Sequence, residues 1–508
     1  MTVLDCVRRI KALRLVPVLF VALLVHTGRA EVPALTWRSP GAAGSRTGDI
    51  LTVCLDRPGH AMFHADVDLT PWTGMILRAT IRSKGSKVVR ARESWLGYKF
   101  MFHYRDEATG QDVWPGAPCW AGDWDWRTSE VRVDLRAAKP GKGRLSLGLQ
   151  DTSGTVSFDL STLTFEEVKP LFVPDTDTTP CVYTDRVRRR PTGRGVMLPG
   201  GPCKEDDFRT LQAWGANLAR YQMIRGWHER NNNQDPAEYL HWVDGKIDHL
   251  LNDVLPWAER YGIDIVVDLH VPPGGREEGG DMNMFYNRLF ADTFLAAWTN
   301  IATRCQGQPR IWGYDLINEP SQSRAALPEC DYWTLQARAA KAVRAIDPVT
   351  PIILESNGWD APAQFRVMKR LDLPDIIYQS HMYEPGTFTH QGVHGSSEKD
   401  WKRLAYPSEG LDRARLKRAL QPVLDFQKRH QAIIYIGEFS AISWAEGADR
   451  YIADVINLLE ENGWHWTYHA FREWEGWSVE HEATGWRKMR PSADNPRKRA
   501  LLKGLSNR

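Results

Sequence analysis

The chain has 508 residues, and its 65 lysines and arginines nearly balance 63 aspartates and glutamates, which leaves a formal net charge of +2 at pH 7. A balanced charge without a basic stripe gives no indication of nucleic-acid binding, and the length exceeds that of one ordinary domain. The 22 tryptophans serve either a large core or stacking on sugar rings, and composition alone does not choose between these roles.

Residues 1–30 have the order of a cleavable secretory signal. Basic residues from Arg8 to Arg14 precede an apolar segment over 15–25, and small residues follow at Gly28–Ala30. The apolar part is too short for a comfortable membrane span, although an uncleaved anchor is the alternative. We therefore expect a secreted protein, extracellular or periplasmic, that begins near Glu31 and has no membrane association once the signal is removed.

Six cysteines follow the signal, and an even number in an exported chain favours disulfides. Their spacing contains no CxxC pair, so we expect no zinc site. A connectivity local to each region is one of many that six cysteines allow: Cys54–Cys119, Cys181–Cys203 and Cys305–Cys330.

Residues 31–168 alternate apolar and polar positions, as over 75–82 and 131–135, with turn signals at Pro140-Gly141. Many short strands separated by turns predict a β-sandwich. The region resembles the jelly-roll carbohydrate-binding modules that are often attached to polysaccharidases, particularly over 154–159. A dense aromatic patch fits sugar binding or, alternatively, a purely structural sandwich whose tryptophans pack inside the protein: Trp114, Trp120, Trp124 and Trp126.

Residues 169–193 are predicted to be a linker, because they are rich in proline, aspartate and threonine and then in arginine. From 194 to 508 strands alternate with helices, which predicts a (β/α)8 TIM barrel with insertions. A doubly wound open sheet is the rival, but no Gly-rich loop follows its first strand. The eight strand candidates lie at 195–198, 217–220, 263–270, 311–317, 352–355, 376–381, 432–438 and 464–470.

Two of these strands end on a glutamate. The run from Ile311 ends in Asn318, Glu319 and Pro320, and a second run ends in Glu438. A carboxyl group at the end of a buried strand lies where apolar surroundings can raise its pKa, so it can act as an acid near neutrality. A single such glutamate is as readily a helix cap or the partner of a surface lysine. Two together indicate the paired carboxylates of glycoside hydrolysis.

On a barrel, the carboxyl ends of the strands meet at one mouth, where active sites lie. We therefore expect the polar residues at those ends to converge although they are far apart in sequence. These candidates are Arg220, His270, Asn318, Glu319, His381, Tyr383, Glu438 and the Trp/His-rich end of the eighth strand.

The barrel region resembles glycoside hydrolase family 5, the cellulase family, which belongs to the clan A retaining glycosidases. Five short motifs in the family's order carry this resemblance across most of 194–480. They are Asn217-Leu218-Ala219-Arg220, Asp268-Leu269-His270 with Pro273-Gly274-Gly275 behind it, Asn318-Glu319-Pro320, His381-Met382-Tyr383 and Gly437-Glu438-Phe439.

The resemblance implies that Glu319 is the general acid/base and Glu438 the nucleophile of a double displacement. Arg220 would favour the ionised form of Glu438, and Tyr383 would orient it by a hydrogen bond. Asn318 is suited to the 2-hydroxyl of the sugar.

The resemblance also places His270 and His381 in the same sugar subsite. It implies that no metal ion or organic cofactor is needed.

One departure from the family concerns the eighth strand, where the family usually has a sugar-stacking tryptophan. Here the run is Trp466-Thr467-Tyr468-His469. The stacking ring is expected at Trp474 or Trp477, with Trp474 taken as the substrate-binding candidate, and substrate specificity is therefore less defined than catalysis.

The sequence predicts a secreted, monomeric, retaining glycosidase that acts on a polysaccharide or oligosaccharide, first of all a β-glucan in the manner of a cellulase or endoglucanase. A β-mannanase and an exo-acting β-glucosidase or β-1,3-glucanase are alternatives within the enzymes. A barrel that binds polysaccharide without cleaving it is the alternative from another class.

Overall fold

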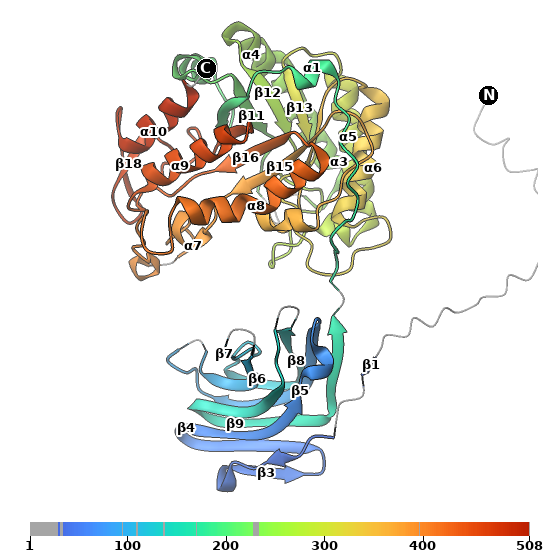
Figure 1. Cartoon of the computed structure of the whole chain (residues 1–508), viewed down its shortest axis with the longest axis vertical. Helices are drawn as coiled ribbons and strands as arrows, with labels where there is room; N and C mark the ends of the chain where they lie inside the picture. Colours follow the sequence, from blue (N-terminus) through green and yellow to red (C-terminus); the bar gives the residue numbers. More distant parts are fainter. Residues whose placement is uncertain are drawn as a thin grey trace, which may run out of the picture. The chain divides into compact units, whose positions relative to one another are not determined.

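The computed structural model describes residues 29–30, 34–93, 95–107, 110–135, 138–168, 170–226, 233–395 and 397–506. The chain forms two compact units, Met1–Pro170 and Leu171–Arg508, which are coloured from blue to teal and from green to red (Figure 1). The expected signal segment lies outside the described residues except for 29–30. Within these ranges, no helix is both long and apolar enough to span a membrane.

The first unit is a β-sandwich, as predicted, built from antiparallel strands around an apolar core. The long strand β9 joins its parts: residues 142–152 pair with β4 and β6, and residues 154–168 pair with β4 and β5. The strands are β1 (Arg29–Ala30), β2 (Trp37–Arg38), β3 (Gly44–Thr47), β4 (Ile50–Asp68), β5 (Ile76–Val88), β6 (Gly97–Asp106), β7 (Gln111–Val113), β8 (Gly122–Asp134) and β9 (Lys142–Val168).

The tryptophans of the predicted aromatic patch have different environments. Trp120 stacks on the buried Tyr98 with ring centroids 5.4 Å apart, and Trp124 meets Tyr98 edge-on at 5.7 Å. Trp126 is half-buried, whereas Trp114 is 60% exposed. Two of these rings therefore help to build the sandwich, and Trp114 remains available to a ligand.

The second unit contains a closed barrel of eight parallel strands, as predicted. It closes where β10 pairs with β17, with Arg194 opposite Trp466. The strands are β10 (Arg194–Met197), β11 (Leu218–Gln222), β12 (Asp264–Asp268), β13 (Ile311–Asp315), β14 (Ile352–Glu355), β15 (Ile376–Met382), β16 (Ile434–Phe439) and β17 (His465–Tyr468).

Helices surround the barrel (Figure 1). Between β14 and β15, where we expected a helix, the structure has only a short 3-10 segment, Pro362–Arg366. The helices are α1 (Asp185–Arg188), α2 (Glu205–Trp214), α3 (Pro236–His249), α4 (Leu255–Tyr261), α5 (Arg288–Cys305), α6 (Tyr332–Ile346), α7 (Gly386–Thr389), α8 (Arg413–His430), α9 (Ala448–Glu461) and α10 (Pro496–Leu505), and β18 (His481–Gly485) pairs with β19 (Lys488–Pro491).

The segment expected to be a linker makes specific contacts with the barrel from Phe172 onward, where the ring of Phe172 meets that of Tyr332 edge-on with centroids 4.7 Å apart. The backbone N–H of Cys181 donates to the carbonyl of His430 at 2.7 Å. The hydroxyl of Tyr183 donates to the carbonyl of Ile376 at 2.8 Å, and Arg190 donates to that of Trp312 at 2.6 Å. Residues 181–190 therefore pack with the barrel unit.

Side chains fill the interior of the barrel in layers. One layer is an apolar cluster formed by Leu218, Val266, Trp312, Ile353, Ile377 and Tyr435. Two residues further along their strands lie Arg220, Asp268, Glu355 and Gln379, all fully buried. Because alternate residues of a strand point to the same face, the period of two places a charged layer directly on the apolar layer.

The expectation of disulfides is wrong for the described residues, in which all six cysteines are free thiols. The hydroxyl of Thr155 donates to the sulfur of Cys54 at 3.2 Å, and the sulfur of Cys203 lies 3.5 Å from Nε2 of His249. Proximity along the chain was the only basis for pairing these cysteines, and a disulfide needs close Cα atoms and suitable directions.

Candidate active site

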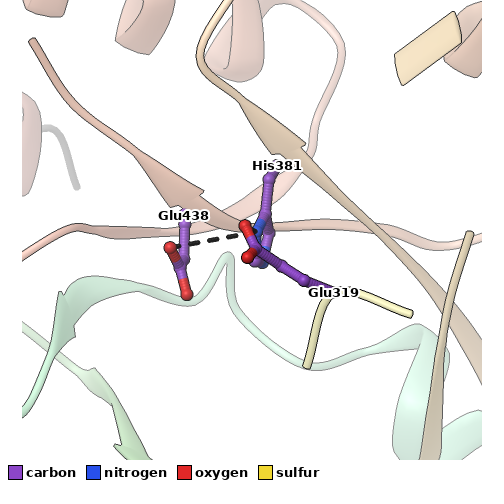
Figure 2. A group of neighbouring side chains, drawn as sticks. All are labelled: Glu319, His381 and Glu438. Carbon is purple, nitrogen blue, oxygen red and sulfur yellow. Dashed lines mark hydrogen bonds and ion pairs between the residues drawn. The ribbon is translucent and has the colours of Figure 1, made fainter. Parts of the chain in front are cut away.

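The two strand-end glutamates meet at the mouth of the barrel. Glu438 lies on β16, and Glu319 lies four residues after the end of β13. An oxygen of each carboxyl group and a ring nitrogen of His381 all lie within 4.8 Å of one another. Figure 2 shows how these three side chains are grouped. The structure therefore places close together the two glutamates that the sequence identified at the ends of strands four and seven.

Both oxygens of Glu438 accept strong hydrogen bonds. Arg220 donates to Oε1 at 2.6 Å, and the hydroxyl of Tyr383 donates to Oε2 at 2.8 Å. Although burial by itself raises the pKa of Glu438, the positive charges of His381, His469 and Arg220 hold it well below its usual range. This carboxylate is therefore held ionised and in a fixed orientation.

Arg220 lies beneath the two glutamates and is fully buried. Its guanidinium also contacts Asp315 at 2.8 Å, Glu355 at 3.0 Å and Asp268 at 3.3 Å. A buried charge is tolerated when it is paired and its donors are used. Arg220 thus links the nucleophile position to the charged layer of the barrel.

The backbone of Glu319 has a left-handed conformation, with φ of 52°, which is uncommon for a residue with a side chain. Arg276 donates to the carbonyls of Asn318 and Glu319 at 3.0 and 2.9 Å, and a Glu355 oxygen accepts the N–H of Glu319. These bonds hold a strained turn that presents the Glu319 carboxyl to the cavity.

His381 contacts both glutamates. Its Nδ1 atom lies 3.0 Å from Oε1 of Glu319 and 3.8 Å from Oε2 of Glu438. Its Nε2 atom lies 3.2 Å from Nε2 of Gln379. The imidazole therefore bridges the pair of carboxyl groups from the side of β15.

Asn318 and His270 complete the predicted set on the other side. The Asn318 oxygen accepts from Arg220 at 3.0 Å, and its amide nitrogen lies 3.2 Å from Nε2 of His270. Nδ1 of His270 lies 2.7 Å from Asp268. The predicted residues Arg220, His270, Asn318, His381 and Tyr383 thus form one hydrogen-bonded network with the two glutamates.

A cavity of about 680 Å³ opens above this network and is lined by both glutamates, His270, Asn318, His381 and Tyr383. Trp477 and Trp359 supply aromatic walls, and Trp359 is 41% exposed. Trp474, which we took as the stacking residue, does not line this cavity. It packs edge-on against Trp444 and Trp477, with centroids 5.9 and 6.0 Å apart.

His469 occupies the wall where the family usually has a tryptophan. Its Nε2 atom lies 3.7 Å from Glu473, which also accepts from Gln222 at 2.8 Å. Burial lowers the pKa of His469, but Glu438 and Glu473 raise it above its usual value. Among the described residues, the buried Nδ1 atom of His469 has no hydrogen-bond partner.

Three fully buried acidic residues that sequence reasoning missed lie below the cavity: Asp315, Glu355 and Asp360. Burial raises the pKa of Asp315 to about 6 against the lowering effect of Arg220. Burial and neighbouring carboxylates likewise raise the pKa values of Glu355 and Asp360. The period of two along β14 and β15 was the signal that could have identified Glu355 and Gln379.

Two groups of side chains have the proximity that a metal site needs: Glu319, His381 and Glu438, and Glu355, Asp360 and His381. In the first group both oxygens of Glu438 already accept hydrogen bonds. In the second, Glu355 already accepts from Arg220 and Gln379. In both groups, carboxylate oxygens that would bind a metal ion already accept hydrogen bonds from protein side chains. This arrangement favours a pair of carboxylates over a metal centre.

Comparison with known proteins gives one family for the barrel unit. The model of the cellulase family, glycosyl hydrolase family 5, matches residues 190–474. Endoglucanase C of Acetivibrio thermocellus is 27% identical over 246 residues, which cover 42% of this chain and 70% of that protein. Cellodextrinase A of Ruminococcus flavefaciens is 23% identical over 253 residues, which cover 48% of this chain and 71% of that protein.

A probable glucan 1,3-beta-glucosidase A of Aspergillus fumigatus is 27% identical over 191 residues, covering 35% of this chain and 42% of that protein. A solved structure of Cel5A from Thermotoga maritima in complex with cellobiose is 24% identical, covers 62% of this chain and 97% of that chain, and has a TM-score of 0.48. Because the family model spans more than half of the chain, the protein belongs to the cellulase family, glycosyl hydrolase family 5, and is a glycosidase.

Proposed function

We propose that the protein hydrolyses a β-glucan with retention of anomeric configuration. The observation that carries this proposal is the proximity of the carboxyl oxygens of Glu319 and Glu438, which lie within 4.8 Å of each other. Retaining glycosidases have carboxyl groups about 5 Å apart, whereas inverting enzymes need about 6.5–9.5 Å to admit a water molecule.

In the first step Glu438 attacks the anomeric carbon. The bond to the departing oxygen breaks, and Glu319 transfers its proton to that oxygen, which leaves a glycosyl ester on Glu438. Glu438 suits this role because its pKa is held below the usual range and because Arg220 and Tyr383 fix its orientation.

In the second step Glu319, now ionised, takes a proton from water, and the water oxygen attacks the anomeric carbon. The ester bond to Glu438 breaks, and the sugar leaves with its original configuration. The contact of His381 with Glu319 at 3.0 Å keeps the same carboxyl group in place as it changes from acid to base. Asn318 presents its amide to the sugar 2-hydroxyl.

The names of the relatives support a β-glucan as the substrate class. They include endoglucanases, a cellodextrinase and a probable glucan 1,3-beta-glucosidase. We further propose that the chain is exported after loss of residues 1–30, and that residues 31–168 form an accessory sugar-binding module of the catalytic domain.

The test is product release from cellulose, mixed-linkage β-glucan, β-1,3-glucan, xyloglucan and mannan, with the native chain beside Glu319→Gln and Glu438→Ala. We expect one β-glucan to be cleaved, and we expect both variants to lose activity by roughly 10³-fold or more. Glu409→Gln is the matched control, because Glu409 is exposed and does not line the cavity.

Cleavage of mannan but of no glucan would contradict the proposed substrate class and leave the proposed mechanism standing. Activity retained in Glu438→Ala would refute the nucleophile assignment. Binding without cleavage of any polymer by the native chain would favour a non-catalytic polysaccharide-binding protein.

A further inference from the structure

A groove of about 900 Å³ lies on the sandwich unit, over the face of β4, β9 and β6 that points away from the core. Ala61, Phe63 and Leu147 point into the core, and the residues between them on the same strands line the groove. The sheet register places His60 opposite Gln150 and His64 opposite Ser146. The groove is therefore an outer surface feature and not a packing defect of the core.

Two tryptophans line the groove and are unusually exposed. Trp95 is 64% exposed and Trp114 is 60% exposed. One face of Trp114 is covered by His103, with ring centroids 3.7 Å apart and an angle of 20° between the planes. The exposed area of Trp114 therefore belongs to its other face and edges. Large exposed aromatic surface on a folded domain marks a binding site, and flat rings suit the faces of sugar rings.

Two cations also line the groove. Arg144 lies on β9 and is exposed, while Lys99 lies on β6 and is 8% exposed. Lys99 donates to the carbonyl of Trp95, and burial lowers its pKa, opposed by Cys119 and Asp151. Within the described residues, neither Lys99 nor Arg144 forms an ion pair with a carboxylate.

The polar floor of the groove is neutral or basic. Nδ1 of His64 lies 2.9 Å from the hydroxyl of Ser146, and Gln150 and His60 continue this row of polar groups. Among the described residues that line the groove, no side chain is acidic. A buried cation without a carboxylate partner is costly, so a ligand that supplies the missing negative charge fits the site.

We propose that this groove binds an extended acidic glycan, a sugar chain that carries carboxylates, with its rings against Trp114 and Trp95 and its carboxylates beside Lys99 and Arg144. A glycan is favoured over an acidic peptide because the same chain contains a glycosidase and because the exposed rings suit sugar faces. The proposal depends on the family of the barrel but not on which polymer the barrel cleaves.

The experiment uses the full chain with Glu319→Gln, so that the probes are not degraded. Two hexasaccharides with the same β-1,4-linked backbone are titrated by calorimetry: cellohexaose, and its counterpart oxidised to carboxylate at each C6. We expect Trp114→Ala to weaken binding of the acidic hexamer by about tenfold or more and Arg144→Gln to weaken it by about tenfold. Binding of cellohexaose should be insensitive to Arg144→Gln.

Matched controls are Trp126→Ala and Arg46→Gln, which remove a half-buried tryptophan and an exposed arginine of the same unit outside the groove. Both should bind the acidic hexamer as the parent does. Hydrogen exchange of the parent chain provides a second readout if Trp114→Ala misfolds, because the acidic hexamer should protect residues 111–118.

The proposal would be overturned if both groove variants bound the acidic hexamer with unchanged affinity. It would also be overturned if the acidic hexamer protected only residues outside 111–118 from hydrogen exchange. Equal losses for the neutral and acidic hexamers in Trp114→Ala, with none in Arg144→Gln, would overturn the assignment to an acidic ligand. Failure of the barrel to cleave β-glucan appears in the product-release assay and does not alter these binding results.

Discussion

The apolar and charged layers of the barrel interior are made by the same strands, yet they are stabilised differently. The apolar layer, which includes Ile353 and Ile377, is held by packing. Two residues along, Glu355 and Gln379 belong to a layer whose stability depends on Arg220. Within the barrel interior, the comparison shows buried charge at the layer that supports the catalytic pair, where Arg220 pairs with the carboxylates.

The largest expected effect comes from removing that cation. Arg220→Met leaves several buried carboxylates unpaired, so we expect a loss of about 3–5 kcal/mol in the free energy of unfolding. We also expect kcat to fall by roughly 10³-fold or more, because Glu438 loses its partner. Urea unfolding and initial rates on the cleaved polymer measure the two effects.

The matched change in the apolar layer is Ile353→Val, which should cost about 0.5–1.5 kcal/mol and leave kcat nearly unchanged. Arg220→Lys keeps the charge but not the forked donors, so it should recover part of the stability and little of the rate. Equal effects of Arg220→Met and Ile353→Val on kcat would contradict the difference between the layers.

The buried carboxyl group of Asp315, which contacts Arg220 at 2.8 Å, should also give the barrel a distinct pH dependence. The pKa of Asp315 is about 6 in the folded state and has a usual value of 3.8, so the folded state binds more protons between these pH values. The contribution of Asp315 to the free energy of unfolding is then greatest below about pH 4. It falls by about 3 kcal/mol as the pH rises through about 6. The lowered pKa of Glu438 affects stability only at lower pH, where the free energy of unfolding falls as the pH falls.

The check is the free energy of unfolding of the barrel at pH 4.5 and pH 6.5, for the native chain and for Asp315→Asn. Burial lowers the pKa values of His390 and His465 to about 4, which by itself stabilises the barrel as the pH rises over this interval. The informative quantity is therefore the difference between the two chains: from pH 4.5 to pH 6.5 the free energy of unfolding should change more favourably in Asp315→Asn than in the native chain. An equal change in both chains would contradict the raised pKa of Asp315.

A smaller effect is expected on the cavity wall above the charged layer. His469→Ala removes an imidazole that lines the cavity and should raise KM by about tenfold, since a polar contact with the substrate is lost. Its control, Trp474→Phe, alters a ring outside the cavity and should leave KM unchanged. A lower kcat at constant KM in His469→Ala would instead indicate that His469 acts mainly on Glu438.

The smallest expected effect is deletion of residues 31–168. Because the barrel has its own closed sheet and its own core, we expect kcat/KM on a soluble β-glucan to stay within about twofold. Initial rates of the truncated and full chains provide the comparison. A truncated chain that does not fold would show that the sandwich is structural.

The sequence predicted the features that follow from local pattern. Buried strands that end on Glu319 and Glu438 placed both carboxylates on the barrel, and the period of two predicted the sandwich. Other features depend on how distant segments meet. The period of two along β14 indicates that Glu355 points into the barrel, but only the closed barrel shows that it lies 3.0 Å from Arg220.

The sequence also could not predict which tryptophan forms the aromatic wall of the cavity. Whether Trp474 or Trp477 faces the cavity depends on the path of the loop after β17, which has no periodic pattern. The proposed disulfides failed for a similar reason, since spacing along the chain does not fix the separation of cysteine sulfurs in space.

The most direct test of the catalytic account is capture of the covalent intermediate. The native chain would be incubated with a 2-deoxy-2-fluoro-glucoside that has a good leaving group, then digested and analysed by mass spectrometry. The account predicts one glycosyl adduct on the peptide that contains Glu438, with an increased yield when Glu319→Ala removes the base for its hydrolysis. An adduct on a different residue, or turnover that gives the inverted anomer without any adduct, would contradict it.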